Sequence, residues 1–317
     1  GLLESAVQIA GNFVDKGTEI VRTKYSDSTN VKIYRTPKKP IDTKIPLAVL
    51  INDGTASSAE IVSGSLQDLD RAVVIGQRSY GKGLVQVSVD LPYNANLKLT
   101  TSKYYIPSGR CIQAINYKHS GGGYTERIPD SLTHVFRTRG GREVRDGGGI
   151  MPDVEVKPDT LPNIAVYLDR IDSTEVMFDY VTEYIASHPS IAPATEFRLT
   201  DAEWQDFKQR VIKSGFTYDP MSGKRFDELV KIARFEGYYD DARAEFDALK
   251  AKLSHDVGRD LEQNKDVICQ MIESDIISAY YYQAGSIKAG LVHDKALKAA
   301  VELLKSGTRY SSTLSPK

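Results

Sequence analysis

The sequence predicts an α/β core followed by a mainly α-helical domain. Up to about residue 157, short runs of β-type residues are separated by Gly, Pro, Asn and Asp, and one clear helix interrupts them. From about Leu161 onward, long amphipathic segments rich in charged residues take their place. A chain of 317 residues, of which 41% are hydrophobic, is long enough for two domains. We therefore expect one domain over residues 1–157 and a helical one over residues 162–310.

The first domain is expected to contain a strand, turn, helix and strand in that order. The continuous apolar run Leu47–Ile51 is typical of a strand that is buried on both faces. A helix from about Ser57 to Leu69 follows it directly, and this order is the pattern of an α/β core. The other expected strands are Thr18–Lys24, Val31–Arg35, Ala72–Ile75, Leu84–Leu91 and Leu97–Tyr105.

The second domain carries helix start and stop signals. Thr200 and Glu203 have the spacing of a capping box, which predicts the start of a helix. Gly215 and Gly307 follow basic last turns and are expected to end helices. Pro-containing stretches at residues 157–162 and 188–193 are expected to be linkers or ordered turns.

Composition excludes several classes of function. With 41 basic and 42 acidic residues the formal net charge is −1, so no overall field favours binding to nucleic acid or an anionic membrane. No apolar run approaches the roughly 20 residues that cross a bilayer. Cys111 and Cys269 lie far apart in unlike segments, so we expect two unpaired thiols and neither a disulfide nor a zinc site. The chain opens at Gly1 inside a helical pattern, so we expect any export signal to precede it.

A dense group of small and hydroxylated residues lies between the buried strand and the helix, at residues 52–60. A side chain at this turn lies at a helix N-terminus, where free N–H groups and the helix dipole stabilise an oxyanion. Ser57 is the candidate nucleophile of this group. The alternative is an ordinary N-cap, because Ser, Thr and Asp are favoured there in any protein.

A nucleophilic Ser needs a general base, and histidine is the usual one. None of the five histidines has a neighbouring acid in a recognisable motif; they are His119, His134, His188, His255 and His293.

A lysine held partly out of water is the other known base. Lys82 lies in the turn Ser79–Gly83 between two apolar strands, and its flanking glycines allow close backbone approach. Gln86, four residues later, can accept a hydrogen bond from the amine. The alternative is an exposed Lys at a hairpin tip.

Together these segments resemble the active-site signature of the carboxyl-terminal processing (tail-specific) peptidases. The resemblance rests on Asn52–Ile61, Gly76 and Tyr80–Gln86, and weaker likenesses at Thr101–Arg110 and Gly149–Val154 extend it over about residues 1–157. In that family the nucleophilic Ser is followed 25 residues later by the base Lys, and four residues further on by an orienting Gln or Glu. Ser57, Lys82 and Gln86 have this spacing. The helical half resembles the carboxyl-terminal segment of some envelope-associated members.

The resemblance implies a fold, an activity and a location. It implies a core of the crotonase-like or caseinolytic-protease-like type, and a serine endopeptidase that cleaves unfolded or tail-exposed proteins through an acyl-enzyme. Backbone N–H groups at Gly1 and Ser58 would form the oxyanion hole. No metal or cofactor is implied, the partners would be protein or peptide substrates, and a homo-oligomer is left open. The family also implies a PDZ domain upstream of Gly1 and a place in the periplasm or cell envelope.

One departure and two alternatives remain. The family more often shows Ser-Ala-Ser-Ala-Ser-Glu where this chain has Thr55–Glu60, which makes Ser58 an adjacent candidate, but the spacing to Lys82 selects Ser57. A non-catalytic module that holds a peptide on the same fold is the competing class, since this segment lacks the expected upstream part. An acyl-coenzyme A hydratase-type enzyme ranks third, because no paired carboxylates lie in the required context.

Overall fold

The computed structural model describes residues 1–25, 30–114, 129–158, 160–171, 174–218, 221–253 and 256–316. Contacts divide the chain into two compact units. The first contains Gly1–Pro158 and Lys295–Lys317, and the second contains Asp159–Asp294. The α/β core and the helical domain that the sequence predicts are both present.

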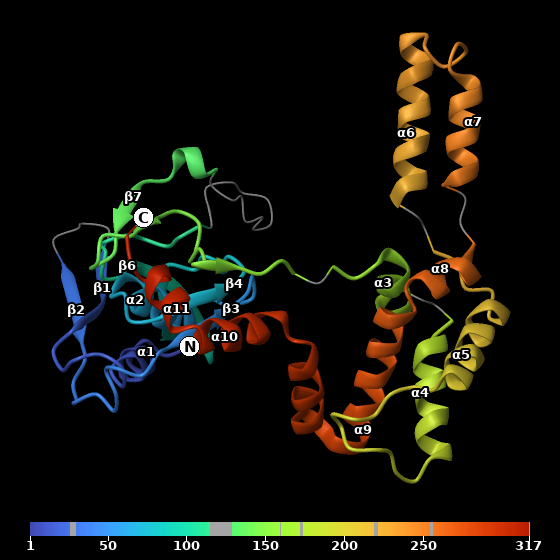
Figure 1. The fold of residues 1–317 in the computed structure, drawn as a ribbon. Coiled ribbons are helices and arrows are strands. Elements are labelled where there is room, and N and C mark those ends of the chain that lie inside the picture. The colour runs from blue at the N-terminus through green and yellow to red at the C-terminus, as the bar shows by residue number, and fades with distance from the viewer. Residues whose placement is uncertain are drawn as a thin grey trace. The chain divides into compact units, whose positions relative to one another are not determined.

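The first unit is built on two main sheets (Figure 1). One is antiparallel in the order β2-β1-β6-β5, and the other is parallel in the order β3-β4-β9, while β7 and β8 form a small separate pair. The strands are β1 (Glu19–Tyr25), β2 (Val31–Arg35), β3 (Ala48–Ile51), β4 (Val73–Gly76), β5 (Leu84–Leu91), β6 (Ala95–Tyr105), β7 (Val135–Arg137), β8 (Glu143–Arg145) and β9 (Val154–Glu155). A short 3-10 turn, η1, covers Asp130–Leu132.

Helices α1 (Leu3–Ala10) and α2 (Ser58–Asp68) complete the main core of this unit. Every residue of β4 is buried, as a strand covered on both faces should be. On one side of it, α2 contributes Ile61 and Leu66 to a cluster that also contains residues of α1, β1 and β6. The N-terminus of α2 is held where strand β3 ends, after a turn of residues 52–57.

The last two helices belong to the first unit. In α10 (Lys295–Lys305), Ala300 and Leu303 lie on one face and pack against Val73 and Ile75 of β4. In α11 (Gly307–Thr313), the Tyr310 hydroxyl accepts a hydrogen bond from the Leu47 N–H at 2.8 Å and donates to the Leu47 carbonyl at 3.1 Å.

Two expectations differ from this arrangement. The helical domain was expected to run to residue 310, but residues 295–310 pack on the sheet of the first unit, because the apolar face of α10 covers β4. The run Leu47–Ile51 was expected to be buried on both faces. Strand β3 instead lies at the edge of its sheet, where Ile51 is buried but Leu50 is 41% exposed.

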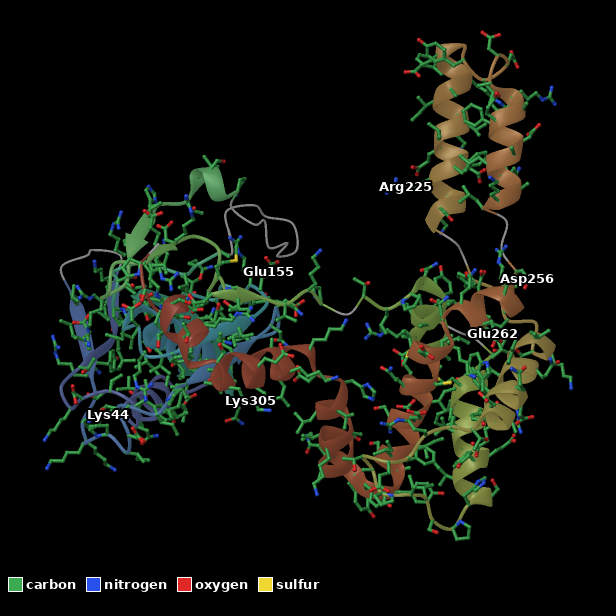
Figure 2. The ribbon with its side chains drawn as sticks, in the orientation of Figure 1. Lys44, Glu155, Arg225, Asp256, Glu262 and Lys305 are labelled. Carbon is green, nitrogen blue, oxygen red and sulfur yellow. The ribbon has the colours of Figure 1, made fainter. Side chains whose placement is uncertain are left out.

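The helix stop predicted at Gly307 is confirmed. Helix α10 ends two residues before it at Lys305, a basic last-turn residue (Figure 2), and Gly307 then begins α11.

The second unit is helical throughout the part that the structure describes. Its core gathers large side chains, including the fully buried Trp204, Phe207 and Ile272. The helices are α3 (Asn163–Arg170), α4 (Val176–Ser187), α5 (Asp201–Lys213), α6 (Met221–Glu236), α7 (Arg243–Lys252), α8 (Val257–Gln263) and α9 (Lys265–His293). Helices α6 and α7 run side by side as a hairpin (Figure 1). No helix among the described residues is long and apolar enough to span a bilayer.

Helix ends in this unit follow local signals. Thr200 accepts a hydrogen bond from the Glu203 N–H at 3.3 Å, and the Glu203 carboxylate accepts one from the Thr200 N–H at 2.6 Å, so the predicted capping box is confirmed. Gly215 follows α5 with φ +75°, which is the left-handed conformation of a helix end. Asp256 caps α8 by accepting from the Arg259 N–H at 2.6 Å (Figure 2).

Candidate active site

Ser57 occupies a strained backbone position at the start of α2. Its φ of 58° and ψ of −121° lie outside the regions that residues with a Cβ usually adopt. The turn before it is fixed by the Asn52 side chain, which accepts from the Gly54 N–H at 3.1 Å. Such strain persists only where the surroundings enforce it, and it is common where a side chain must be presented for chemistry.

The buried carboxylate of Glu60 joins the Ser57 turn to the Lys82 turn. One oxygen accepts from the Ser57 N–H at 2.8 Å and from the Lys82 N–H at 2.9 Å. The other accepts from the Gly81 N–H at 2.7 Å and from the Ser79 hydroxyl. Glu60 is 0% exposed, so these four donors replace the water that the charged group has lost. The carboxylate therefore fixes the backbone at Ser57 and Lys82 relative to each other.

Tyr104 of β6 makes a second connection between the same turns. Its hydroxyl donates to the Lys82 carbonyl at 2.6 Å and also lies 3.2 Å from the Ser57 carbonyl. Burial, together with the nearby Glu60 carboxylate, raises the pKa of Tyr104 far above its ordinary value. The phenol therefore keeps its proton and remains a donor at every physiological pH.

The Lys82 turn needs glycine on both sides. Gly81 has φ +89°, and a Cβ placed on it would come within 2.4 Å of the Ala114 Cβ. A Cβ on Gly83 would come within 2.8 Å of the Gln113 backbone nitrogen. The close backbone approach that the sequence predicted for these glycines is confirmed, and it leaves Lys82 half-buried.

The predicted site residues line one hollow of about 320 Å³, which we call the Ser57 hollow. Its lining includes Gly1, Ser57, Ser58, Lys82 and Gln86. Apolar side chains from α1, α2 and β5 form much of the remaining wall. The structure thus brings together five residues that are spread over the first 86 positions of the chain.

The side chains of the candidate residues Ser57, Lys82 and Gln86 are not hydrogen-bonded to one another in the described structure. Within the described residues, no hydrogen bond joins the Ser57 hydroxyl to the Lys82 amine, or the Lys82 amine to Gln86. The Gln86 amide instead donates to the Thr100 hydroxyl at 3.3 Å, which leaves its carbonyl oxygen free to accept. Catalytic hydrogen bonds are often loose in an empty site and tighten when substrate binds.

The N-terminus of α2 offers a donor for an oxyanion. The N–H groups of Glu60 and Ile61 bond to the Ser57 carbonyl at 2.8 and 3.1 Å. The Ser58 N–H has no acceptor in the part of the chain that the structure describes. Gly1 lies beside the Ser58 side chain, since a Cβ placed on Gly1 would come 2.1 Å from the Ser58 hydroxyl oxygen. These two positions are the ones that the sequence suggested for an oxyanion hole.

Two protein-family models match separate parts of this chain. Residues 1–119, which contain the whole Ser57 hollow, match the model of peptidase family S41. The first 119 residues of the chain therefore belong to peptidase family S41. Residues 167–304 match a second model, the C-terminal helical domain of a probable PDZ-protease. The family predicted from the spacing of Ser57, Lys82 and Gln86 is therefore confirmed.

Several curated proteins resemble the S41 region. The carboxy-terminal-processing protease of Bartonella bacilliformis is 44% identical over 115 residues, which are 36% of this chain and 26% of that protein. The chloroplastic C-terminal processing peptidase of Tetradesmus obliquus is 35% identical over 141 residues, which are 44% of this chain and 30% of that protein. The chain thus spans between a quarter and a third of the length of these relatives.

A solved structure, the photosystem II D1 C-terminal processing protease, is 31% identical. The match covers 51% of this chain and 33% of the solved chain, with a TM-score of 0.36.

None of the described histidines lines the Ser57 hollow. His134 is exposed and lies 3.2 Å from the Asp146 carboxylate, His188 stacks on Tyr184 in the second unit, and His293 ends α9. His119 and His255 lie outside the described residues. Both cysteines are free thiols, as predicted.

The role of Glu60 was missed at the sequence level. The Ser57–Glu60 spacing indicates a local capping box and gives no sign of the contacts to Gly81 and Lys82.

Proposed function

We propose that this chain carries the catalytic part of a serine-type endopeptidase, with Ser57 as nucleophile and Lys82 as general base. The observation that carries the proposal is that Ser57 and Lys82 line one hollow while Glu60 fixes the backbone of both turns. Membership of peptidase family S41 supports it. So does the strained backbone of Ser57 at the N-terminus of an 11-residue helix.

In the proposed mechanism Ser57 attacks the scissile carbonyl while Lys82 takes the hydroxyl proton. The oxyanion that forms is stabilised by the unpaired Ser58 N–H, by a donor at Gly1 and by the positive end of α2. Lys82 then returns the proton to the leaving amine, and an acyl-enzyme remains on Ser57. Water attacks this ester with Lys82 again as base. Gln86 positions the Lys82 amine through its free carbonyl oxygen.

We propose that the substrates are unfolded proteins or proteins with exposed carboxyl-terminal tails. The support is the resemblance of the active-site signature and the names of the relatives, which are carboxyl-terminal processing proteases. A location in the periplasm or cell envelope and a homo-oligomer remain predictions from the same resemblance. We also propose that the second unit is a separate domain that contributes no catalytic group.

The experiment that tests this proposal compares neighbouring serines. Ser57→Ala should lower the cleavage of fluorescently labelled unfolded casein by about 10⁴-fold or more, because removing a nucleophile abolishes the covalent route. Ser58→Ala should keep most of the activity, since Ser58 is proposed to contribute its backbone N–H and not its hydroxyl. Loss in Ser58→Ala with activity kept in Ser57→Ala would reverse the assignment.

The competing proposal is a non-catalytic module that binds peptides in the same hollow. It gains support if the folded wild-type chain binds labelled casein but cleaves it no faster than Ser57→Ala does. Circular dichroism of both proteins provides the control for folding.

A further inference from the structure

The hairpin formed by β5 and β6 has two unlike faces. On one face the register pairs Gln86 with Thr100, Ser88 with Lys98, and Asp90 with Asn96. On the other face it pairs two sets of exposed apolar residues, Val87 with Leu99 and Val89 with Leu97. Because side chains alternate between the faces of a strand, the polar residues share one surface. The Gln86–Thr100 hydrogen bond lies on that surface.

The polar face contributes Gln86 and Lys98 to the Ser57 hollow. Lys98 played no part in the sequence prediction, yet it lines the same hollow as the proposed nucleophile and base. Its side chain is exposed, and it forms no ion pair or hydrogen bond with any residue that the structure describes. Asp90, the acidic residue on this face, does not line the hollow.

The described lining of the hollow contains no Asp or Glu side chain, whereas two lysines, Lys82 and Lys98, line it. Because Lys82 must be neutral to act as the proposed base, Lys98 is the lining side chain that supplies a positive charge. The N-terminus of α2 adds further positive potential at Ser57 and Ser58. The Glu60 carboxylate is buried and does not line the hollow, and four donors already use its oxygens. A hollow of this charge complements an anionic group on its ligand.

The two lysines are held differently. The backbone of Lys82 is fixed by Glu60 and Tyr104, which suits a group that must reach one hydroxyl proton. Lys98 extends from an exposed strand, and its long stem with three donors suits it to meet a charge whose position varies between substrates.

We propose that Lys98 is the anion-recognising residue of this site and binds a carboxylate that the peptide substrate carries close to its scissile bond. This inference rests on the proposed function, because it names the chemistry of the substrate of that same hollow. The carboxylate is either the free carboxyl terminus or an Asp or Glu side chain. Both sources present the same carboxylate group to Lys98, and peptides that carry only one of the two carboxylates distinguish them.

The test measures peptide binding to the full chain carrying Ser57→Ala, so that no cleavage occurs. Three fluorescein-labelled peptides of one sequence are compared: one with a free carboxyl terminus, one with a carboxyl-terminal amide, and an amidated one in which an internal Gln is replaced by Glu. We expect at least one carboxylate peptide to bind about 3- to 5-fold more tightly than the neutral amide at low salt. The preference should shrink at 0.5 M salt.

Substitutions assign this preference to Lys98. Lys98→Gln should abolish it and Lys98→Glu should reverse it. Lys44→Gln is the matched control, because it removes the same charge from an exposed residue of the first unit that does not line the hollow (Figure 2). Circular dichroism checks the folding of each variant. Equal or undetectable binding of all three peptides, or a preference that survives Lys98→Gln, overturns the inference.

Cleavage by the chain with Ser57 intact distinguishes this inference from the proposed function. If the chain is a peptidase, Lys98→Gln should raise KM for the carboxylate peptide about 3- to 5-fold and leave kcat and the neutral peptide unchanged. If no peptide is cleaved but the binding preference depends on Lys98, the proposed peptidase activity is wrong and the anion site is supported. If the carboxylate and neutral peptides are cleaved with the same KM, the peptidase activity is supported and the anion site is wrong.

Discussion

Replacing Glu60 by Gln tests whether one carboxylate organises both the Ser57 turn and the Lys82 turn. One oxygen of Glu60 accepts from two backbone N–H groups, and the other accepts from the Gly81 N–H and the Ser79 hydroxyl. An NH₂ group in place of the second oxygen leaves at least the Gly81 N–H without an acceptor, because a hydroxyl can turn to accept but a backbone N–H cannot. A buried donor left without a partner costs about 1–3 kcal/mol, which predicts a loss of at least about 1–3 kcal/mol. That is a large fraction of the roughly 5–15 kcal/mol that stabilises a domain. Catalysis should fall as well, since the backbone at Ser57 and Lys82 loses its common anchor.

The assay must report on the first unit alone. Trp204, the single tryptophan of the chain, lies in the core of the second unit, so its fluorescence in urea serves as an internal control. Amide hydrogen exchange of residues 79–83, followed by mass spectrometry, reports on the Lys82 turn. We expect Glu60→Gln to accelerate exchange there and to leave the Trp204 transition unchanged. Glu155→Gln, on an exposed residue of the same unit (Figure 2), should change neither.

Wild-type hydrogen exchange at residues 79–83 in Glu60→Gln, together with normal cleavage of substrate, would refute this role of the carboxylate. Glu60 would then be a local helix cap, and its contacts to Gly81 and Lys82 would contribute little to the free energy of unfolding.

Three further predictions concern single residues of the first unit. Lys82→Arg should be as inactive toward labelled casein as Lys82→Ala, because arginine keeps the charge but cannot release its proton; near wild-type cleavage would remove Lys82 as the base. Gly81→Ala should lower the urea midpoint more than Gly17→Ala. Both have φ above +80°, but a Cβ at Gly81 meets Ala114 whereas one at Gly17 meets nothing within 4 Å, so equal losses would exclude the steric cause. Burial raises the pKa of the Cys111 thiol, so less thiolate is present at neutral pH. Alkylation of Cys111 by iodoacetamide, followed by mass spectrometry, should be slower at pH 7.5 than that of a cysteine peptide and should accelerate as pH rises; an equal rate at pH 7.5 would contradict this.

Local sequence signals predicted the elements that form the site. Strands β2 and β5 have the predicted bounds, because turn residues border clear β-type runs. The helix at α2 follows strand β3 as expected, although that strand is not buried on both faces, and the spacing of Ser57 and Lys82 identified the family. Strands β7, β8 and β9 were not predicted, since runs of two or three residues are too short to show a period.

Features that depend on contacts between residues far apart in the chain could not be predicted from the sequence. The amphipathic face of α10 indicates that Ala300 and Leu303 are buried, but it cannot say that β4 is the surface that covers them. Glu60 shows the same limit, because its partners Gly81 and Lys82 lie more than 20 positions away in the chain. Lys98 was overlooked because only the register of β5 and β6 brings its strand beside the hollow.

The return of α10 to the parallel sheet has a consequence for synthesis on the ribosome. Strand β4 is complete at Gly76, yet the helix that covers Val73 and Ile75 begins only at Lys295. At roughly 5–20 residues per second, translating the intervening segment takes roughly 10–45 s. During that interval the nascent chain presents an uncovered apolar strand surface, which favours aggregation or capture by a chaperone. The S41 core, although it precedes the helical unit in this sequence, is among the last parts of this chain to reach its final packing.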